Sequence, residues 1–405
     1  MKLALISDDY LPHSTRVGAK MVHELARELV YQGHQVTVIT PKLKVRASSL
    51  LEDSLDGVVV WRFQCGPLKD VGKVTRAINE SLLSHNAWRA INRQVKEHTF
   101  DGIIYYSPSI FFGSLVAKLK KRCKCKSYLV LRDFFPQWVV DSGLIRQGSL
   151  IERYFRFFES VSYKNADTIG VMSQRNLDIF NKKTNHRFRA SILRNWASIK
   201  PHQVSDNAKN LRHNLGLRGK IIYFYGGNIG HAQDMENLMR LVRSMQTYDN
   251  VHFLFVGQGD EVQLITDLAA KWQLSNFSYL PSVSQDEFRD ILGQVDVGLF
   301  SLSAKHTAHN FPGKLLGYMV QSLPILGSVN QDNDLINLML DNNAGFVSVN
   351  GDDDSLLANA VTLYESHDLR RKIGLAGYNL LKKEFAVSSV ALTISGSFWR
   401  GNESF

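Results

Sequence analysis

The chain has 405 residues, of which 44% are hydrophobic and only 9 are proline, so it is long enough for two packed domains and its composition excludes a disordered protein. Its formal net charge is +10, but no nucleic-acid-binding motif accompanies the basic residues, which argues against a nucleic-acid partner. The three cysteines, two of them spaced as Cys123-Lys-Cys125, form no zinc or redox motif and favour a reducing cytoplasm.

The chain opens with an apolar run that Asp8 and Asp9 end. This run is too short for a secretory or membrane-spanning segment, so we expect a buried first strand. Apolar strands and amphipathic helices then alternate, which predicts a parallel sheet wrapped by helices, as in Rossmann-like folds. The predicted strands are 3–7, 36–40, 58–63, 103–106, 127–131 and 168–172, and the predicted helices are 19–32, 74–98, 110–121 and 150–165.

The pattern becomes polar around residues 195–214, where we place a domain boundary, and a second series then begins. Its predicted strands are 221–225, 252–256, 277–280, 297–300 and 324–327, and its predicted helices are 235–245, 260–272, 285–292, 314–320 and 354–366. We therefore expect an α/β protein with two doubly wound domains. Ligands of open α/β sheets bind beyond the carboxyl ends of the strands, so a substrate is expected in the cleft between two facing sheets.

Two segments of the second half are typical of phosphate-binding loops. Backbone amides after Pro312 and Gly313 would lie at a helix N-terminus, where the dipole favours an anion, and Lys314 adds positive charge. Gly227, between a strand and a helix, would let the backbone approach phosphate oxygens closely. We expect the diphosphate of a nucleotide sugar there. The alternatives are an exposed helix lysine and an ordinary tight turn.

Several motifs occur in an order that resembles the large family-4 glycosyltransferases of bacterial surface polysaccharide synthesis, which have the GT-B fold. They are Gly33-His34 with the strand after it, Ala166-Asp167, Arg194-Asn195, Gly227-Asn228 and the segments 255–260 and 312–324. Within this family, residues 131–138 and 309–319 most resemble the O-antigen and capsule transferases that handle N-acetyl-L-fucosamine (L-FucNAc).

The resemblance implies two facing Rossmann-like domains: residues 1–198 would bind the acceptor, residues 199–386 would bind the nucleotide sugar, and residues 387–405 would form a helix returning to the first domain. It also implies transfer of an N-acetylated deoxyhexosamine, L-FucNAc from UDP-L-FucNAc, to a polyprenyl-diphosphate-linked sugar in O-antigen or capsule biosynthesis. The enzyme would act in the cytoplasm at the inner face of the plasma membrane, with a UDP-sugar as donor substrate and no metal or other cofactor.

The donor residues are carried over from the resemblance. Gly227 and Asn228 would lie at the phosphates, residues 281–283 near the base, and Gln258 on the same wall. The full set that we expect to bind the donor is Arg194, Gly227, Asn228, Gln258, Pro281, Val283, Asn310, Phe311, Pro312, Gly313, Lys314 and Leu315.

Two departures from the family concern charge. The Glu-x7-Glu element falls on His309 and Gly317, so His309 remains a candidate catalytic residue through hydrogen bonding only. The Arg and Lys of the glycine turn align with Asn228 and Gln233. Neutralisation of the phosphates would then shift to other groups, for which the candidates are Lys314, Arg194, the helix N-terminus after Pro312, and a protonated His231. For Arg194 and His231, an ordinary surface role is the alternative.

In the first half, Arg16 and Gly18 resemble the glycine turn of the family and could contact donor or acceptor anions, although Arg16 could also be an exposed loop residue. Asp133 follows a strand and is our candidate to accept the proton of the acceptor hydroxyl; a helix N-cap is its structural alternative, and Asp8 and Asp9 compete for the role. A metal at His306 and His309 is disfavoured because no third ligand has suitable spacing.

The basic charge gathers in residues 118–126 and 146–158, and aromatic side chains accompany it in the second of these segments. This pattern is typical of a membrane-surface patch, and equally of a solvated helix face beside core aromatics. Three rival functions remain. They are a UDP-sugar 2-epimerase of the same two-domain plan, an inactive GT-B scaffold in polysaccharide assembly, and, last, a nicotinamide-dependent dehydrogenase, for which no Gly-x-Gly-x-x-Gly follows the first strand.

Overall fold

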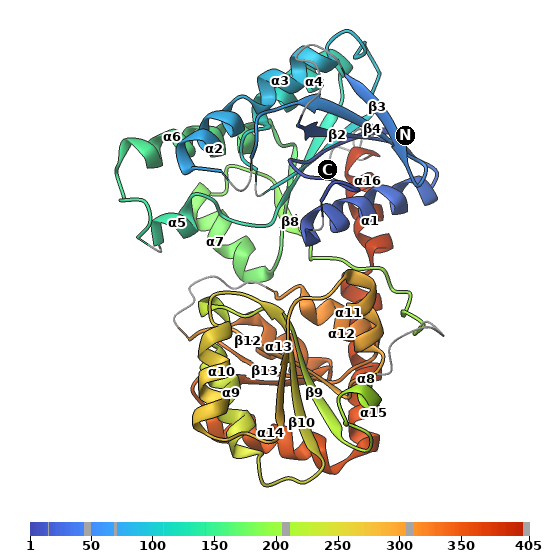
Figure 1. The fold of residues 1–405 in the computed structure, drawn as a ribbon. Coiled ribbons are helices and arrows are strands. Elements are labelled where there is room, and N and C mark those ends of the chain that lie inside the picture. Colours follow the sequence, from blue (N-terminus) through green and yellow to red (C-terminus); the bar gives the residue numbers. More distant parts are fainter. Residues whose placement is uncertain are drawn as a thin grey trace. The chain divides into compact units, whose positions relative to one another are not determined.

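The computed structural model describes residues 1–14, 16–43, 50–68, 71–107, 109–141, 143–204, 211–304 and 311–399. The chain forms two compact units (Figure 1). The first comprises Met1–Trp196 with the segment that begins at Val387, and the second comprises Ala197–Ala386. Each unit is a twisted sheet with helices on both faces, which confirms the predicted α/β fold with two Rossmann-like domains.

The first unit is built on an eight-stranded sheet in the order β3-β4-β2-β1-β5-β6-β7-β8. Its strands are β1 (Lys2–Ile6), β2 (Gln35–Lys42), β3 (Leu51–Leu55), β4 (Val58–Gln64), β5 (Gly102–Tyr106), β6 (Lys126–Leu131), β7 (Thr168–Val171) and β8 (Ala190–Ile192). All neighbouring strands are parallel except β3 and β4, which pair antiparallel. The edge strand β3 was not predicted.

Both faces of this sheet are apolar, because successive side chains of β1 enter opposite core clusters. Leu3 and Leu5 belong to one cluster, and Ala4 and Ile6 belong to the other. The helices are α1 (Val17–Tyr31), α2 (Lys73–Ser81), α3 (Leu83–Ile91), α4 (Gly113–Cys123), α5 (Gln137–Asp141), α6 (Leu150–Asn165), α7 (Gln174–Thr184) and α16 (Val387–Trp399). The last of these, α16, packs on α1. The single helix predicted over 74–98 is two helices, divided at Leu82.

The second unit has a six-stranded parallel sheet in the order β11-β10-β9-β12-β13-β14. The strands are β9 (Ile221–Asn228), β10 (Val251–Gln258), β11 (Phe277–Leu280), β12 (Val297–Ser301), β13 (Ile325–Val329) and β14 (Gly345–Val349). The helices are α8 (Leu211–Asn214), η1 (His231–Gln233), α9 (Met235–Ser244), α10 (Val262–Lys271), α11 (Gln285–Leu292), α12 (Lys314–Val320), α13 (Asp334–Asp341), α14 (Asp353–Glu365), α15 (His367–Leu380) and η2 (Leu381–Phe385).

Candidate active site

A glycine turn lies at the carboxyl end of β9 in the second unit. Gly227 is exposed and has a φ of +116°, which side-chain-bearing residues rarely adopt. A Cβ at Gly257, the partner of Gly227 on β10, would lie 1.8 Å from the Gly227 carbonyl oxygen. Both positions therefore require glycine, and the main chain of the turn is open to a ligand.

The ammonium group of Lys314, the first residue of α12, lies against this turn. Its Nζ is 3.4 Å from the centroid of the Tyr225 ring, and a Cβ built on Gly227 would be 3.9 Å from the same Nζ. The Tyr225 hydroxyl donates a hydrogen bond to the carbonyl oxygen of Asn228, which fixes the ring beneath the turn.

The electrostatic state of Lys314 is unusual. The residue as a whole is partly exposed, but within the described residues its Nζ is buried and has no hydrogen-bond partner. Burial holds the pKa of Lys314 well below its ordinary value. A buried cation without a partner raises the free energy of the folded protein, and an anion bound beside the turn would offset this cost.

The neutral side chains that replace the two basic residues of the family bond to each other. The Asn228 amide nitrogen Nδ2 donates to Gln233 Oε1 at 2.6 Å. The turn therefore offers main-chain groups and amides but no charge of its own. The formal positive charge beside Gly227 comes from Lys314.

The residues expected to surround the nucleotide base lie one strand further along the sheet. Gln258 pairs with Asn228 in the register of β10 and β9. The Ser282 hydroxyl donates to Gln258 Oε1 at 3.0 Å, which joins the loop after β11 to this strand end. Of its neighbours, Pro281 is exposed and Val283 is partly buried against the core. The structure thus brings the predicted groups of β9, β10 and the β11 loop to one edge of the sheet.

The start of α12 offers fewer amides than the sequence suggests. Leu315 is buried and its backbone N–H donates to the Pro312 carbonyl oxygen at 3.1 Å. Phe311 packs on Phe385, with ring centroids 4.6 Å apart, so it belongs to the core. Gly313 is exposed and immediately precedes the seven-residue helix.

Four other candidates for the donor site are not part of this group. His309 and Asn310 fall outside the described residues. Arg194 follows β8 in the first unit, whereas the other described donor candidates lie in the second. His231 is 2.6 Å from Glu261 Oε1 through Nδ1 and 3.5 Å from Asp260 Oδ2 through Nε2. A protonated His231 would therefore already be paired with carboxylates, which favours the surface role over phosphate binding.

The first unit carries a second polar cluster where β5 and β6 end. Arg132 Nη1 donates to the Tyr106 hydroxyl at 2.5 Å. Burial raises the pKa of Asp133, and Arg132 opposes this rise. Burial also raises the pKa of Tyr106, and the carboxylates of Asp133 and Asp8 contribute to that rise. Because α5 begins only at Gln137, Asp133 is not its N-cap. Sequence reasoning missed Tyr106 and Arg132, although both lie at predicted strand ends.

The remaining candidates of the first unit surround the start of α1. Arg16 is exposed, immediately precedes the helix, and donates its backbone N–H to the Ser14 hydroxyl at 3.2 Å. Gly18 is the second helical residue, and a Cβ there would meet no atom within 4 Å. Asp9 accepts a hydrogen bond from the same Ser14 hydroxyl at 2.8 Å.

The residues that the structure describes contain no group of three or more His, Cys, Asp or Glu side chains that could hold a metal ion. No helix among them is both long enough and apolar enough to cross a membrane.

Comparisons with known proteins cover most of the chain. Residues 18–191 match the family described as "Glycosyl transferase 4-like domain", and residues 207–380 match "Glycosyl transferases group 1". The putative colanic acid biosynthesis glycosyl transferase WcaI of Escherichia coli K12 is 24% identical over 74% of this chain and 76% of its own. The probable glycosyltransferase WbjE of Pseudomonas aeruginosa is 25% identical over half of each chain.

Among solved structures, Anabaena HepE in complex with UDP and glucose superposes with a TM-score of 0.67. The match covers 98% of this chain and 99% of HepE, at 14% sequence identity. At that level of identity the likeness concerns the fold alone.

Proposed function

The chain belongs to the family-4 glycosyltransferases, and from this premise we propose that it transfers an N-acetylated deoxyhexosamine, L-FucNAc from UDP-L-FucNAc, to a polyprenyl-diphosphate-linked sugar. The reaction would serve O-antigen or capsule biosynthesis at the inner face of the plasma membrane. The name of WcaI supports a role in polysaccharide biosynthesis, and HepE, which shares the fold, is solved with UDP and glucose. The choice of sugar rests on the resemblance of residues 131–138 and 309–319 to L-FucNAc transferases.

The observation that carries the donor site is the buried ammonium of Lys314 beside Gly227. A diphosphate bound at the turn, beside the exposed residues Gly227 and Asn228, would accept hydrogen bonds from this ammonium. Opposite charge favours the protonated form of a lysine, so the bound diphosphate would raise the pKa of Lys314 toward its ordinary value. The ammonium would then stabilise the negative charge that develops on the leaving UDP.

In the transfer step, a bond forms between the acceptor hydroxyl oxygen and C1 of the sugar, while the bond from C1 to the UDP oxygen breaks. The acceptor hydroxyl loses its proton, and we assign that proton to Asp133. Burial raises the pKa of this carboxyl, which brings it nearer to neutral pH and makes it a better proton acceptor than an ordinary surface carboxylate.

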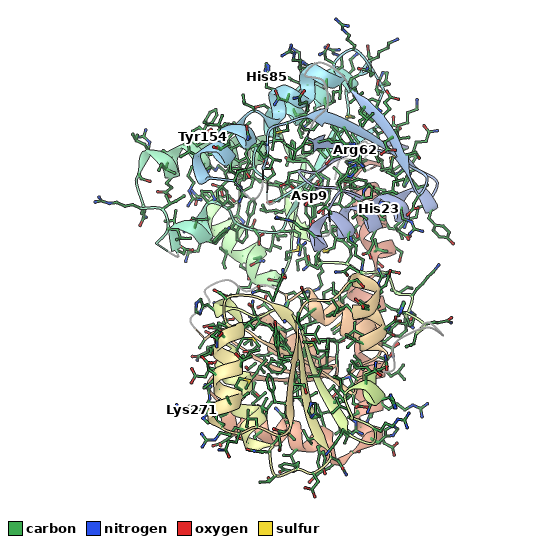
Figure 2. All side chains as sticks on the ribbon, viewed as in Figure 1. Asp9, His23, Arg62, His85, Tyr154 and Lys271 are labelled. Atoms are coloured by element: carbon green, nitrogen blue, oxygen red, sulfur yellow. The ribbon has the colours of Figure 1, made fainter. Side chains whose placement is uncertain are left out.

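A panel of nucleotide sugars tests the proposal by thermal stabilisation, because a ligand that binds only the folded state raises apparent stability with its concentration. We expect UDP-hexosamines to stabilise the wild-type protein. The Lys314→Met variant should lose most of that shift. The matched control is Lys271→Met, which removes an exposed lysine at the end of α10 (Figure 2). Stabilisation by another nucleotide class, with none by UDP-hexosamines, would refute the donor assignment.

Product analysis separates transfer from the rival activities. A glycolipid product formed from UDP-L-FucNAc and a polyprenyl-diphosphate sugar supports transfer. Release of free, C2-epimerised nucleotide sugar without a glycolipid would instead identify an epimerase. A protein that binds the donor but gives neither product would fit the scaffold alternative.

A further inference from the structure

Helix α2 presents an apolar stripe to solvent. Val74 and Ile78 of α2 and Leu82, the residue that follows its last turn, are spaced four residues apart and are 75%, 56% and 45% exposed. Residues four apart lie on one face of a helix, so these side chains form a single row. Such a row on a surface helix normally faces a core. Here it faces outward.

Helix α6 repeats this arrangement. Leu150, Tyr154 and Phe157, at positions i, i+4 and i+7, are 80%, 41% and 63% exposed, and Ile151 beside them is 59% exposed. Other aromatics of the same helix point inward, since Phe155 and Phe158 pack against the core. The sequence had left open whether these aromatics belong to a surface or to the core. Helix α6 places Tyr154 and Phe157 on the surface and Phe155 and Phe158 against the core.

The two stripes lie side by side. The Ser81 and Tyr154 hydroxyls are hydrogen-bonded to each other, which joins the end of α2 to the middle of α6 (Figures 1 and 2). We call the seven residues of the two stripes the outer apolar surface: Val74, Ile78, Leu82, Leu150, Ile151, Tyr154 and Phe157. Exposed apolar residues gathered on two adjoining helices in this way indicate an interaction site rather than a scattering of surface residues.

A basic cavity of about 260 Å³ lies on another face of α6, against α7. Its walls include the cationic side chains of Arg156, Lys164, Lys183 and Arg187, and Glu159 is the one acidic residue among its lining residues. Arg156 is tied to Glu159 at 3.0 Å, so the cavity keeps an excess of positive charge from the other three cations. Burial lowers the pKa of Lys183, a change that a bound anion would reverse.

We propose that the outer apolar surface inserts into the interface of an anionic lipid bilayer and that the basic cavity beside it receives a lipid phosphate group. Apolar side chains on one face of a helix, with cations on the adjoining face, suit a bilayer whose headgroups are negatively charged. A second copy of the chain fits less well, because it would bring the same basic residues toward each other. The inference gives the proposed membrane location a specific surface and rests on that part of the proposed function only, not on the sugar that is transferred.

Vesicle flotation without nucleotide or acceptor tests the inference. We expect the wild-type protein to bind vesicles of phosphatidylcholine with phosphatidylglycerol more tightly than phosphatidylcholine alone. Leu150→Asn with Phe157→Asn should weaken binding more than about tenfold. The matched control is Leu340→Asn with Leu375→Asn, which changes two leucines of the second unit that are 68% and 55% exposed and should leave binding intact.

A second pair of substitutions in the same flotation assay tests the basic cavity. Lys183→Gln with Arg187→Gln should remove most of the preference for anionic vesicles, about tenfold or more, since each cation near a charged surface contributes about 1 kcal/mol. Arg218→Gln with Lys271→Gln removes equal charge from the second unit and should have no such effect.

Either of two results would overturn the inference. One is vesicle binding that stays unchanged when Leu150 and Phe157 are replaced by asparagine. The other is a dimer in sedimentation velocity that dissociates on the same substitutions, which would make this surface an interface between copies. Because UDP-sugar stabilisation is measured without lipid, failure of vesicle binding leaves the donor assignment to be judged separately.

Discussion

Replacing Lys314 by methionine should change stability and nucleotide binding in opposite directions. In the protein without ligand, the Lys314 ammonium is buried without a hydrogen-bond partner among the described residues. Such a group costs about 1–3 kcal/mol, and a methionine of similar length keeps the contact with Tyr225 without that cost. We therefore expect Lys314→Met to raise the free energy of unfolding by an amount within this range.

The pH dependence of this effect has a definite sign. Burial lowers the pKa of Lys314 in the folded protein, whereas the unfolded chain has the ordinary lysine value of about 10.4. Between the two pKa values the unfolded chain binds more protons, so the free energy of unfolding of the wild type rises with pH through this window. The methionine variant lacks this contribution, and its advantage should shrink as the pH approaches the upper value.

UDP binding should respond in the opposite sense. A hydrogen bond to a charged group contributes about 1.5–3 kcal/mol, so loss of the ammonium should weaken UDP binding by about 10- to 150-fold. Because burial lowers the pKa of Lys314 and a bound diphosphate would raise it, UDP binding to the wild type at a pH near the lowered pKa should take up protons, which calorimetry in buffers of different ionisation enthalpy detects. Urea denaturation measures the free energy of unfolding of the wild type and the variant. Unchanged UDP affinity in Lys314→Met, or a variant less stable than the wild type, would refute the reasoning.

Three further predictions concern other positions. Asp133→Asn should lower kcat by between about 10² and 10⁴ without loss of UDP binding, and an unchanged rate would exclude the base role. Because burial raises the pKa of Asp133, the acid limb of the wild-type pH–rate profile should lie above an ordinary carboxyl pKa. Gly257→Ala should destabilise the protein by about 1–3 kcal/mol or more in urea denaturation, because its Cβ would lie 1.8 Å from the Gly227 oxygen. Gly317→Ala should raise the free energy of unfolding by about 0.5–1 kcal/mol with UDP affinity unchanged, since the site is helical and a Cβ there would be 3.5 Å from Leu292 Cδ1; a loss of stability would contradict that packing.

The sequence predicted both sheets because their central strands are buried on both faces and therefore appear as continuous apolar runs. It did not predict β3, whose residues Leu51–Leu55 are mostly exposed and include two carboxylates. An edge strand of this kind is specified by its partner β4 rather than by its own pattern. The division of the predicted helix at Leu82 was missed for a related reason. Apolar residues continue on both sides of it, but one stripe faces outward and the next residues face the core.

The candidate site was predictable in its residue types but not in its contacts. Gly227 and Lys314 could be predicted as phosphate-binding candidates because Gly227 lies where a strand ends and Lys314 lies where a helix begins. The stacking of Lys314 on Tyr225 depends on how α12 packs against β9, which no local pattern encodes. The pairing of His231 with Glu261 likewise joins two loops that are separate in sequence.

The change from the family pattern has a physical consequence for how UDP would be held. Charged side chains on a glycine turn are screened by water, whereas an ammonium buried against Tyr225 acts in a medium of lower effective dielectric constant. It also contacts the Tyr225 ring before any ligand arrives, so little reorganisation of this side chain would accompany the development of charge on the leaving group. A single lysine held in this way would compensate for the two cations that Asn228 and Gln233 replace, and proton uptake on UDP binding would be the measurable sign of that arrangement.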